Sequence, residues 1–191
     1  MQIGPRDALI VVDVQNDFCP EGALPVPEGD KVVPIINSLI PRFGTVFYTR
    51  DWHPQDHCSF DDEPTYTDMH WPAHCVADSP GAEFHGDLIV PLDAPVVSKA
   101  VDPEHEAYSG FQETDLADQL RARQIERIFV CGLATDYCVK FTAMDGLKEG
   151  FEVVLVENAC RGIDNPPGSL GDAVDEMKQA GVQMCWSGDL S

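Results

Sequence analysis

The stretch RIFVCGLATDYCVKF, residues 127–141, decides how this chain folds. Its first seven residues form an apolar run typical of a buried strand, and Thr135 then offers a side chain that suits the start of a helix. Cys138 follows three residues later, where free backbone N–H groups and the positive helix end favour a thiolate. We therefore expect Cys138 to be exposed and to have a lowered pKa. The alternative is a small core residue, as free cysteines usually are and as we expect for Cys131, Cys160 and Cys185.

Working outward from this stretch, apolar runs of strand type alternate with segments of helical spacing. The strand-type runs are ALIVVDV (8–14), TVFYTR (45–50), PVVSKA (95–100), RIFVCGL (127–133), FEVVLVE (151–157) and VQMCW (182–186). Helical spacing marks 30–43, 114–124 and 167–181. This rhythm predicts an α/β fold, a single-domain three-layer α/β/α arrangement over residues 1–191 with a mainly parallel six-stranded sheet.

Composition narrows the range of partners and locations. The 191 residues carry 33 acidic and 12 basic side chains, a net charge of -21. That balance argues against nucleic acid and against anionic membranes, because both need a positive surface, and it leaves small-molecule substrates open. The first apolar run is too short for a signal peptide or a membrane span, and the seven cysteines lack CxxC pairs. We expect a cytoplasmic protein with mostly free thiols, whose oligomeric state, including a homo-oligomer, stays open.

Chemistry-bearing residues lie where predicted strands end. Asp13 follows the first run, Asp51 and His53 the second, Lys99 closes the third, and Cys138 follows the fourth. Because parallel strands present their carboxyl ends at one edge of a sheet, these residues are expected to converge. A buried lysine needs an anion and a buried aspartate needs a cation. A purely structural Lys99–Asp13 ion pair is therefore the alternative to a catalytic role. With a thiol nearby, the three predict Asp13 as acid and base, Lys99 as electrostatic support and Cys138 as nucleophile.

Residues 51–87 lack periodicity and hold five of the six histidines, which favours a functional loop. Asp51 and His53 point the same way in an extended segment, and His74 would complete a face of two histidines and one carboxylate. We therefore predict one divalent metal ion, with zinc favoured and iron or manganese as alternatives. His57 is a candidate fourth ligand or a supporting residue. Surface or hydrogen-bonded roles are expected for the remaining histidines, His70, His85 and His105.

Five segments together resemble the nicotinamidases, metal-dependent amidases of the isochorismatase-like hydrolase superfamily. They are VDVQNDFCPEGALPV (12–26), YTRDWHPQDHCSF (48–60), WPAHCV (71–76), SKAVDPEHEAYSGF (98–111) and VCGLATDYCVKFTAMDG (130–146). The match runs from about Asp7 to about Trp186. The superfamily shares the Asp, Lys and Cys positions, whereas the DxH…WPxHC signature marks the nicotinamidase branch. The resemblance implies hydrolysis of nicotinamide to nicotinic acid and ammonia for NAD salvage, through a cysteine thioester, and activity that extends to pyrazinamide.

The resemblance also implies roles at single positions. Asp13, Lys99 and Cys138 match the catalytic triad, and Asp51, His53 and His74 match the metal ligands. Phe18 and Trp71 match aromatic residues that sandwich the pyridine ring, and Tyr108 and Leu133 match further substrate-binding residues. A cis bond between Leu133 and Ala134 would turn the N–H groups of Ala134 and Cys138 into an oxyanion hole. Some relatives take a further ligand from the loop after the DxH pair, so the coordination number is open.

Three other functions fit parts of the pattern. Another amidase or hydrolase of the superfamily would keep Asp13, Lys99 and Cys138 but would not need the metal set or Trp71. A two-histidine, one-carboxylate iron oxygenase would use the metal set and leave Lys99 and Cys138 idle. A binding protein would hold nicotinamide without turnover, and the complete set of candidate catalytic and metal residues argues against it.

Overall fold

A computed structural model describes residues 1–67 and 69–191 and contains one six-stranded sheet in which every neighbouring pair is parallel. The strand order is β3-β2-β1-β4-β5-β6. The α/β class and the parallel sheet predicted from the alternating pattern are confirmed. The strands are β1 (Asp7–Val12), β2 (Val46–Asp51), β3 (Val96–Lys99), β4 (Arg127–Leu133), β5 (Glu152–Arg161) and β6 (Gln183–Cys185).

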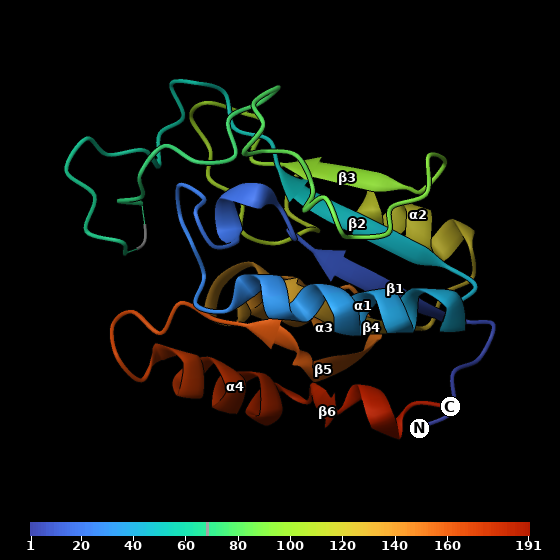
Figure 1. Cartoon of the computed structure of the whole chain (residues 1–191). Coiled ribbons are helices and arrows are strands. Elements are labelled where there is room, and N and C mark those ends of the chain that lie inside the picture. Colours follow the sequence, from blue (N-terminus) through green and yellow to red (C-terminus); the bar gives the residue numbers. More distant parts are fainter. Residues whose placement is uncertain (68) are drawn as a thin grey trace.

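Helices cover the sheet on both faces, as Figure 1 shows, with α1 in front of the strands and α2 and α3 behind them. The helix α4 packs against α3. The described α-helices are α1 (Val32–Leu39), α2 (Leu116–Ala122), α3 (Lys140–Lys148) and α4 (Ser169–Ala180), and a π-helical turn, Thr135–Val139, joins β4 to α3. Each predicted helical segment contains one of these helices, and the helix expected after Thr135 begins with the π-helical turn.

The two central strands form the core of the molecule. All six residues of β1 and six of the seven residues of β4 are buried. Strands covered on both faces bury side chains from every position, which explains why these runs are continuously apolar rather than alternating. The predicted core cysteines are all buried, Cys131 in β4, Cys160 in β5 and Cys185 in β6, and all seven cysteines are free thiols.

The chain reverses its direction of winding between β1 and β4. It runs outward from β1 to β2 and β3, then returns to place β4 on the other side of β1. Ligands of open α/β sheets bind outside the carboxyl ends of the strands at such a point. Asp13 follows β1 and Cys138 lies in the turn after β4, so the topology places both at this position.

Gly132 allows the closest approach of β4 to β1 beside this point. Its φ is 118°, and a Cβ atom there would lie 2.0 Å from the carbonyl oxygen of Val12. An L side chain would meet both an unfavourable backbone conformation and a backbone clash. Glycine is therefore required where the two central strands end.

The segment between β2 and β3 folds over the carboxyl ends of the strands, as Figure 1 shows for its cyan-to-green course. Short bridges hold it there: His53 pairs with Val76 and Phe60 with Trp71 in parallel, and Gln15 after β1 pairs with Phe84. The predicted loop is thus held over the edge of the sheet where the candidate residues converge. The two termini meet at the opposite end, where the Ile3 N–H donates to the carbonyl of Ser191 at 2.9 Å.

Among the described residues, no helix is both long and apolar enough to cross a bilayer.

Gly132→Ala is expected to lower the free energy of unfolding by about 3 kcal/mol or more, since it combines a strained φ with overpacking against β1. Urea unfolding followed by circular dichroism measures this loss. Gly171→Ala is the matched control, because Gly171 lies exposed in α4 with no atom within 4 Å of the added Cβ. This control should be within about 1 kcal/mol of wild type or more stable. Equal stability of the two variants would contradict the close approach.

Candidate active site

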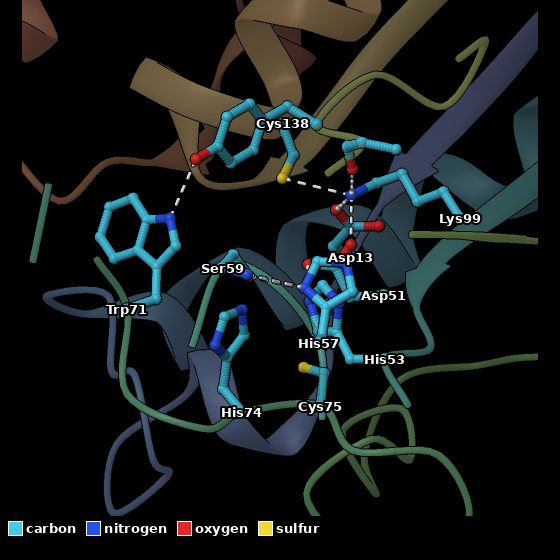
Figure 2. A network of polar contacts seen from close by, with 12 residues as sticks. Asp13, Asp51, His53, His57, Ser59, Trp71, His74, Cys75, Lys99 and Cys138 are labelled. Atoms are coloured by element: carbon cyan, nitrogen blue, oxygen red, sulfur yellow. Dashed lines mark hydrogen bonds and ion pairs between the residues drawn. The ribbon is translucent and has the colours of Figure 1, made fainter. Parts of the chain in front are cut away.

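The ammonium group of Lys99 is the centre of the candidate site. It lies at the end of β3, is 1% exposed, and reaches the carboxylates that follow β1 and end β2. Its Nζ lies 3.0 Å from Oδ2 of Asp13, donates to Oδ1 of Asp51 and to the carbonyl of Ala107 at 3.1 Å, and lies 3.4 Å from Sγ of Cys138. Figure 2 shows the ammonium group between the sulfur atom and the two carboxylates. The predicted convergence of these side chains is therefore present.

The charges in this cluster depend on one another. Burial alone would lower the pKa of the Lys99 ammonium, but Asp13 and Asp51 outweigh it and hold the pKa well above its ordinary value. Burial raises the pKa of Asp13, and Lys99 opposes this rise. Burial also acts to raise the pKa of Asp51, but Lys99 and His53 bring it well below its ordinary range. The site thus contains a permanent cation, a permanent anion and one carboxyl group suited to exchanging a proton.

Cys138 departs from the expectation of an exposed, acidic thiol. Cys138 is only 6% exposed. Burial raises the pKa of its thiol well above the ordinary value, although Lys99 acts in the opposite direction. The helix geometry also differs, because Ala134 is the N-cap residue and Cys138 is the fourth residue of a π-helical turn. The resting group is a thiol, so reaction requires a base. The reacting atoms of Asp13 and Cys138 lie within 4.8 Å of each other.

Asp51, His53 and His74 form a cluster whose candidate ligand atoms all lie within 4.8 Å of one another. His53 is 1% exposed, and neither of its ring nitrogens makes a hydrogen bond within the described structure. The Nδ1–H of His74 donates to the carbonyl of Pro72 at 2.7 Å, which leaves Nε2 free, and burial lowers the pKa of His74 to about 4. Unpartnered buried imidazole nitrogens beside a carboxylate fit a divalent metal ion.

His57 lies beside this cluster but its nitrogens are already used. Its ring centroid is 4.3 Å from that of His53. Figure 2 labels both residues beside Asp51. Its Nδ1 lies 2.7 Å from Oγ of Ser59 and its Nε2 lies 3.1 Å from the carbonyl of His105. A carbonyl can only accept, so Nε2 carries the proton and Nδ1 accepts from the Ser59 hydroxyl. These bonds hold His57 beside His53, and its ligand atom also lies within 4.8 Å of those of His53 and Glu106, so both predicted roles of His57, fourth ligand or supporting residue, stay predictions.

The other histidines have the surface or hydrogen-bonded environments expected of them. His70 is exposed and lies 2.8 Å from Oδ2 of Asp61. His105 is also exposed, and Nδ1 of His85 accepts the N–H of Asp87 at 3.2 Å.

A pocket opens between the thiol and the metal-type cluster. The Nε1–H of Trp71 donates to the hydroxyl of Tyr108 at 2.9 Å, and the ring of Phe18 lies 5.5 Å from that of His74. The structure brings together three aromatic residues predicted for substrate binding with both candidate clusters. The pocket is lined by Phe18, Leu24, Asp51, Trp71, His74, Tyr108, Ala134, Tyr137, Cys138 and Ile163.

Leu133 is the exception among the predicted binding residues. It is fully buried and does not line the pocket; its Cδ1 lies 3.4 Å from the position of a Cβ on Gly29. As the last residue of β4, it directs its side chain into the core instead of toward the pocket. The peptide bond between Leu133 and Ala134 is cis, and the pocket begins with Ala134.

Sequence reasoning missed several residues of this site. Tyr137 packs edge-to-face on Trp71 with a centroid distance of 4.9 Å, and its position next to Cys138 was the available signal. Gln15 is fully buried: its amide donates to the carbonyls of Asp51 and Ala82 at 2.8 Å, and it accepts the Asp51 N–H. A polar residue among buried positions near the end of β1 could have suggested this role. Leu24 and Ile163 carry no local signal.

Thr49 holds the Asp13 carboxylate, as Gln15 holds the backbone of Asp51. Its hydroxyl group lies within β2 and donates to Oδ1 of Asp13 at 2.6 Å. The bond leaves Oδ2 of Asp13 facing Lys99, which fixes the orientation of the carboxyl group.

Known proteins are similar to this chain along almost its whole length. The Isochorismatase domain model matches residues 7–187. The nicotinamidase of Escherichia coli is 41% identical, over 94% of this chain and 94% of that protein. The zinc complex of the Pyrococcus horikoshii pyrazinamidase has 48% identity and a TM-score of 0.87, covering 95% of this chain and 99% of that chain. PnC1 of L. infantum in complex with nicotinate has 37% identity and a TM-score of 0.89, covering 98% and 96%. The chain belongs to the isochorismatase family.

Proposed function

We propose that this protein is a metal-dependent nicotinamidase that hydrolyses nicotinamide to nicotinic acid and ammonia, accepts pyrazinamide, and serves NAD salvage. The observation that carries the proposal is the Lys99 ammonium, which contacts Asp13 and Cys138 on one side and the metal-type ligand Asp51 on the other. A cysteine hydrolase without a metal would not need the second cluster. The similarity to a nicotinamidase and to a nicotinate complex supports the choice of substrate.

Asp51, His53 and His74 would hold the metal ion, with zinc favoured by the bound ion of the similar pyrazinamidase. A bound divalent ion would supply a Lewis-acid anchor for the pyridine nitrogen. Phe18 and Trp71 would stack on the ring, and the pocket places both beside Cys138. These residues together would orient the carboxamide carbon toward the sulfur before reaction, which removes much of the entropic cost of the encounter.

The raised pKa of the Cys138 thiol assigns the first step to Asp13. In the proposed reaction Asp13 takes the thiol proton while the sulfur attacks the carboxamide carbon. The N–H groups of Ala134 and Cys138 stabilise the oxyanion, an effect typically worth about 2.7–4 kcal/mol per donor. Asp13 then gives the proton to the departing nitrogen, the C–N bond breaks, and ammonia leaves a thioester on Cys138.

The second half of the reaction regenerates the enzyme. Asp13 accepts a proton from a water molecule, which attacks the thioester carbon and releases nicotinic acid. The proton returns to the sulfur. The raised pKa of Asp13 suits a group that must hold and release a proton in each half, and Lys99 keeps its positive charge throughout. A partner macromolecule has no part in this scheme.

Cys138→Ala is expected to lower ammonia release from nicotinamide by at least about 1,000-fold, because the nucleophile is lost. Metal content, measured by mass spectrometry of the purified protein, should stay at the wild-type level, since Cys138 is not a proposed ligand. Cys58→Ala is the matched control, because Cys58 is an exposed free thiol in the segment between β2 and β3. Ammonia release that survives in Cys138→Ala would refute the thioester.

His53→Ala is expected to weaken metal binding because a proposed ligand is lost. The loss of affinity should exceed roughly 10–100-fold, the usual effect of removing a residue that only supports a ligand. The KM for nicotinamide should rise because the ring loses its anchor. Metal titration by calorimetry and steady-state kinetics measure the two effects. His70→Ala, an exposed histidine of the same loop, should change neither quantity. Wild-type metal content together with an unchanged KM in His53→Ala would exclude a role of this cluster in orienting the substrate.

A further inference from the structure

The π-helical turn that carries Cys138 also contains a second buried carboxylate, Asp136, which the proposed reaction does not use. Asp136 is 5% exposed. Its Oδ1 accepts the N–H of Ile163 at 2.9 Å, and its Oδ2 accepts the N–H of Asp164 at 2.8 Å and the hydroxyl of Ser169 at 3.1 Å. Both oxygens are therefore committed to the segment that follows β5.

This segment is held unusually close to the turn. A Cβ atom on Gly162 would lie 2.9 Å from Oδ1 of Asp136 and 2.6 Å from Cδ1 of Leu170. Only glycine permits this approach without displacement of its neighbours. Hydrogen bonds from N–H groups to an ionised carboxylate are also roughly twice as strong as neutral ones. The position of the segment is thus set by the turn that bears the nucleophile.

Ile163 connects this anchor to the pocket. It lines the pocket together with Cys138 and Ala134, although it lies far from both in the sequence. Asn165 ties the same segment to the loop between β2 and β3 and to Tyr137, which lines the pocket. The Nδ2 of Asn165 donates to the carbonyl of Tyr66 at 2.9 Å, and the hydroxyl of Tyr137 lies 3.4 Å from the carbonyl of Asn165.

We infer that Asp136 is a positioning residue: its carboxylate holds Ile163 as a fixed wall of the pocket and so limits which ring-substituted carboxamides reach Cys138. The inference rests on the proposed amidase function and assigns one determinant of its substrate range. A wall made by a single aliphatic side chain discriminates by size. Its selectivity depends on how firmly its backbone is held, and in this segment the two N–H groups bound by Asp136 provide that hold.

The test compares kcat/KM for nicotinamide with kcat/KM for nicotinamides that carry one methyl group at each ring position in turn. The ratio of the two constants does not depend on the fraction of enzyme that is correctly folded, so a loss of stability alone leaves it unchanged. Ile163→Ala should relax discrimination at the ring position facing the wall by about tenfold or more, the usual effect of space for one methyl group. Asp136→Asn should relax it at the same position by a smaller factor.

Asp7→Asn is the matched control. Asp7 is also 5% exposed and also binds a backbone N–H, that of Gly4, but it lies at the start of β1 and pairs with Arg127. This variant should keep the wild-type ratios even if it is less stable. A change of ratio in Asp7→Asn equal to that in Asp136→Asn would overturn the inference, as would unchanged ratios at every ring position in Asp136→Asn.

Hydrogen–deuterium exchange separates this inference from the proposed function. Asp136→Asn should speed exchange in peptides covering residues 162–168. The substitution replaces one carboxylate oxygen by an NH₂ group, which cannot accept the N–H of Ile163 or Asp164. Asp7→Asn should leave these peptides unchanged. Absence of ammonia release by metal-loaded wild type would refute the proposed function while the exchange result still stands. Unchanged exchange in Asp136→Asn would refute the positioning role whatever the substrate is.

Discussion

The contact of the Lys99 ammonium with Asp13 and Asp51 is the interaction on which the rest of the structure depends. All three groups are removed from solvent, and a buried charge without its partner typically costs about 3–5 kcal/mol. Lys99 ends β3, Asp51 ends β2 and Asp13 follows β1, so the cluster also joins the carboxyl ends of three strands. Any substitution that removes the ammonium leaves two neighbouring carboxylates, and one of them must then take up a proton.

Asp51 connects the two halves of the site. Its Oδ1 accepts from Lys99, while Oδ2 lies 3.7 Å from Nε2 of His53. One carboxylate thus belongs to both the catalytic cluster and the candidate metal cluster, and Gln15 fixes its backbone on both sides. A change of charge at one cluster therefore alters the electrostatic potential at the other. This sharing explains why the nucleophile and the ring-binding region can lie within a single small pocket.

Much of the fold and many of the site residues could be predicted, because both depend on local pattern. Buried parallel strands need continuous apolar runs, and each run was visible in the sequence with boundaries within a few residues for most strands. Asp13, Lys99 and Cys138 stood at the ends of such runs, and the topology of a parallel sheet brings these ends to one edge. Ile163 could not be found in this way, because it lies far in the sequence from the other pocket residues, and its N–H meets Asp136 only after the chain has folded, across 27 residues. The substrate-binding role expected of Leu133 stays a prediction, because its side chain is fully buried and does not line the pocket.

Periodicity, strand order along the chain and simple counting are enough to establish the parallel α/β class, the residues that converge at the edge of the sheet and the acidic composition. The electrostatic environment at that edge depends on the folded chain. The helix start at Cys138 predicted a lowered thiol pKa, whereas burial raises it, and the proposed reaction therefore relies on Asp13 as the base. Tertiary contacts also decided that His57 binds Ser59 and the carbonyl of His105, while His53 keeps both nitrogens unpartnered. A pKa and a hydrogen-bond partner depend on solvent exclusion and on neighbours distant in the chain, and neither is contained in local pattern.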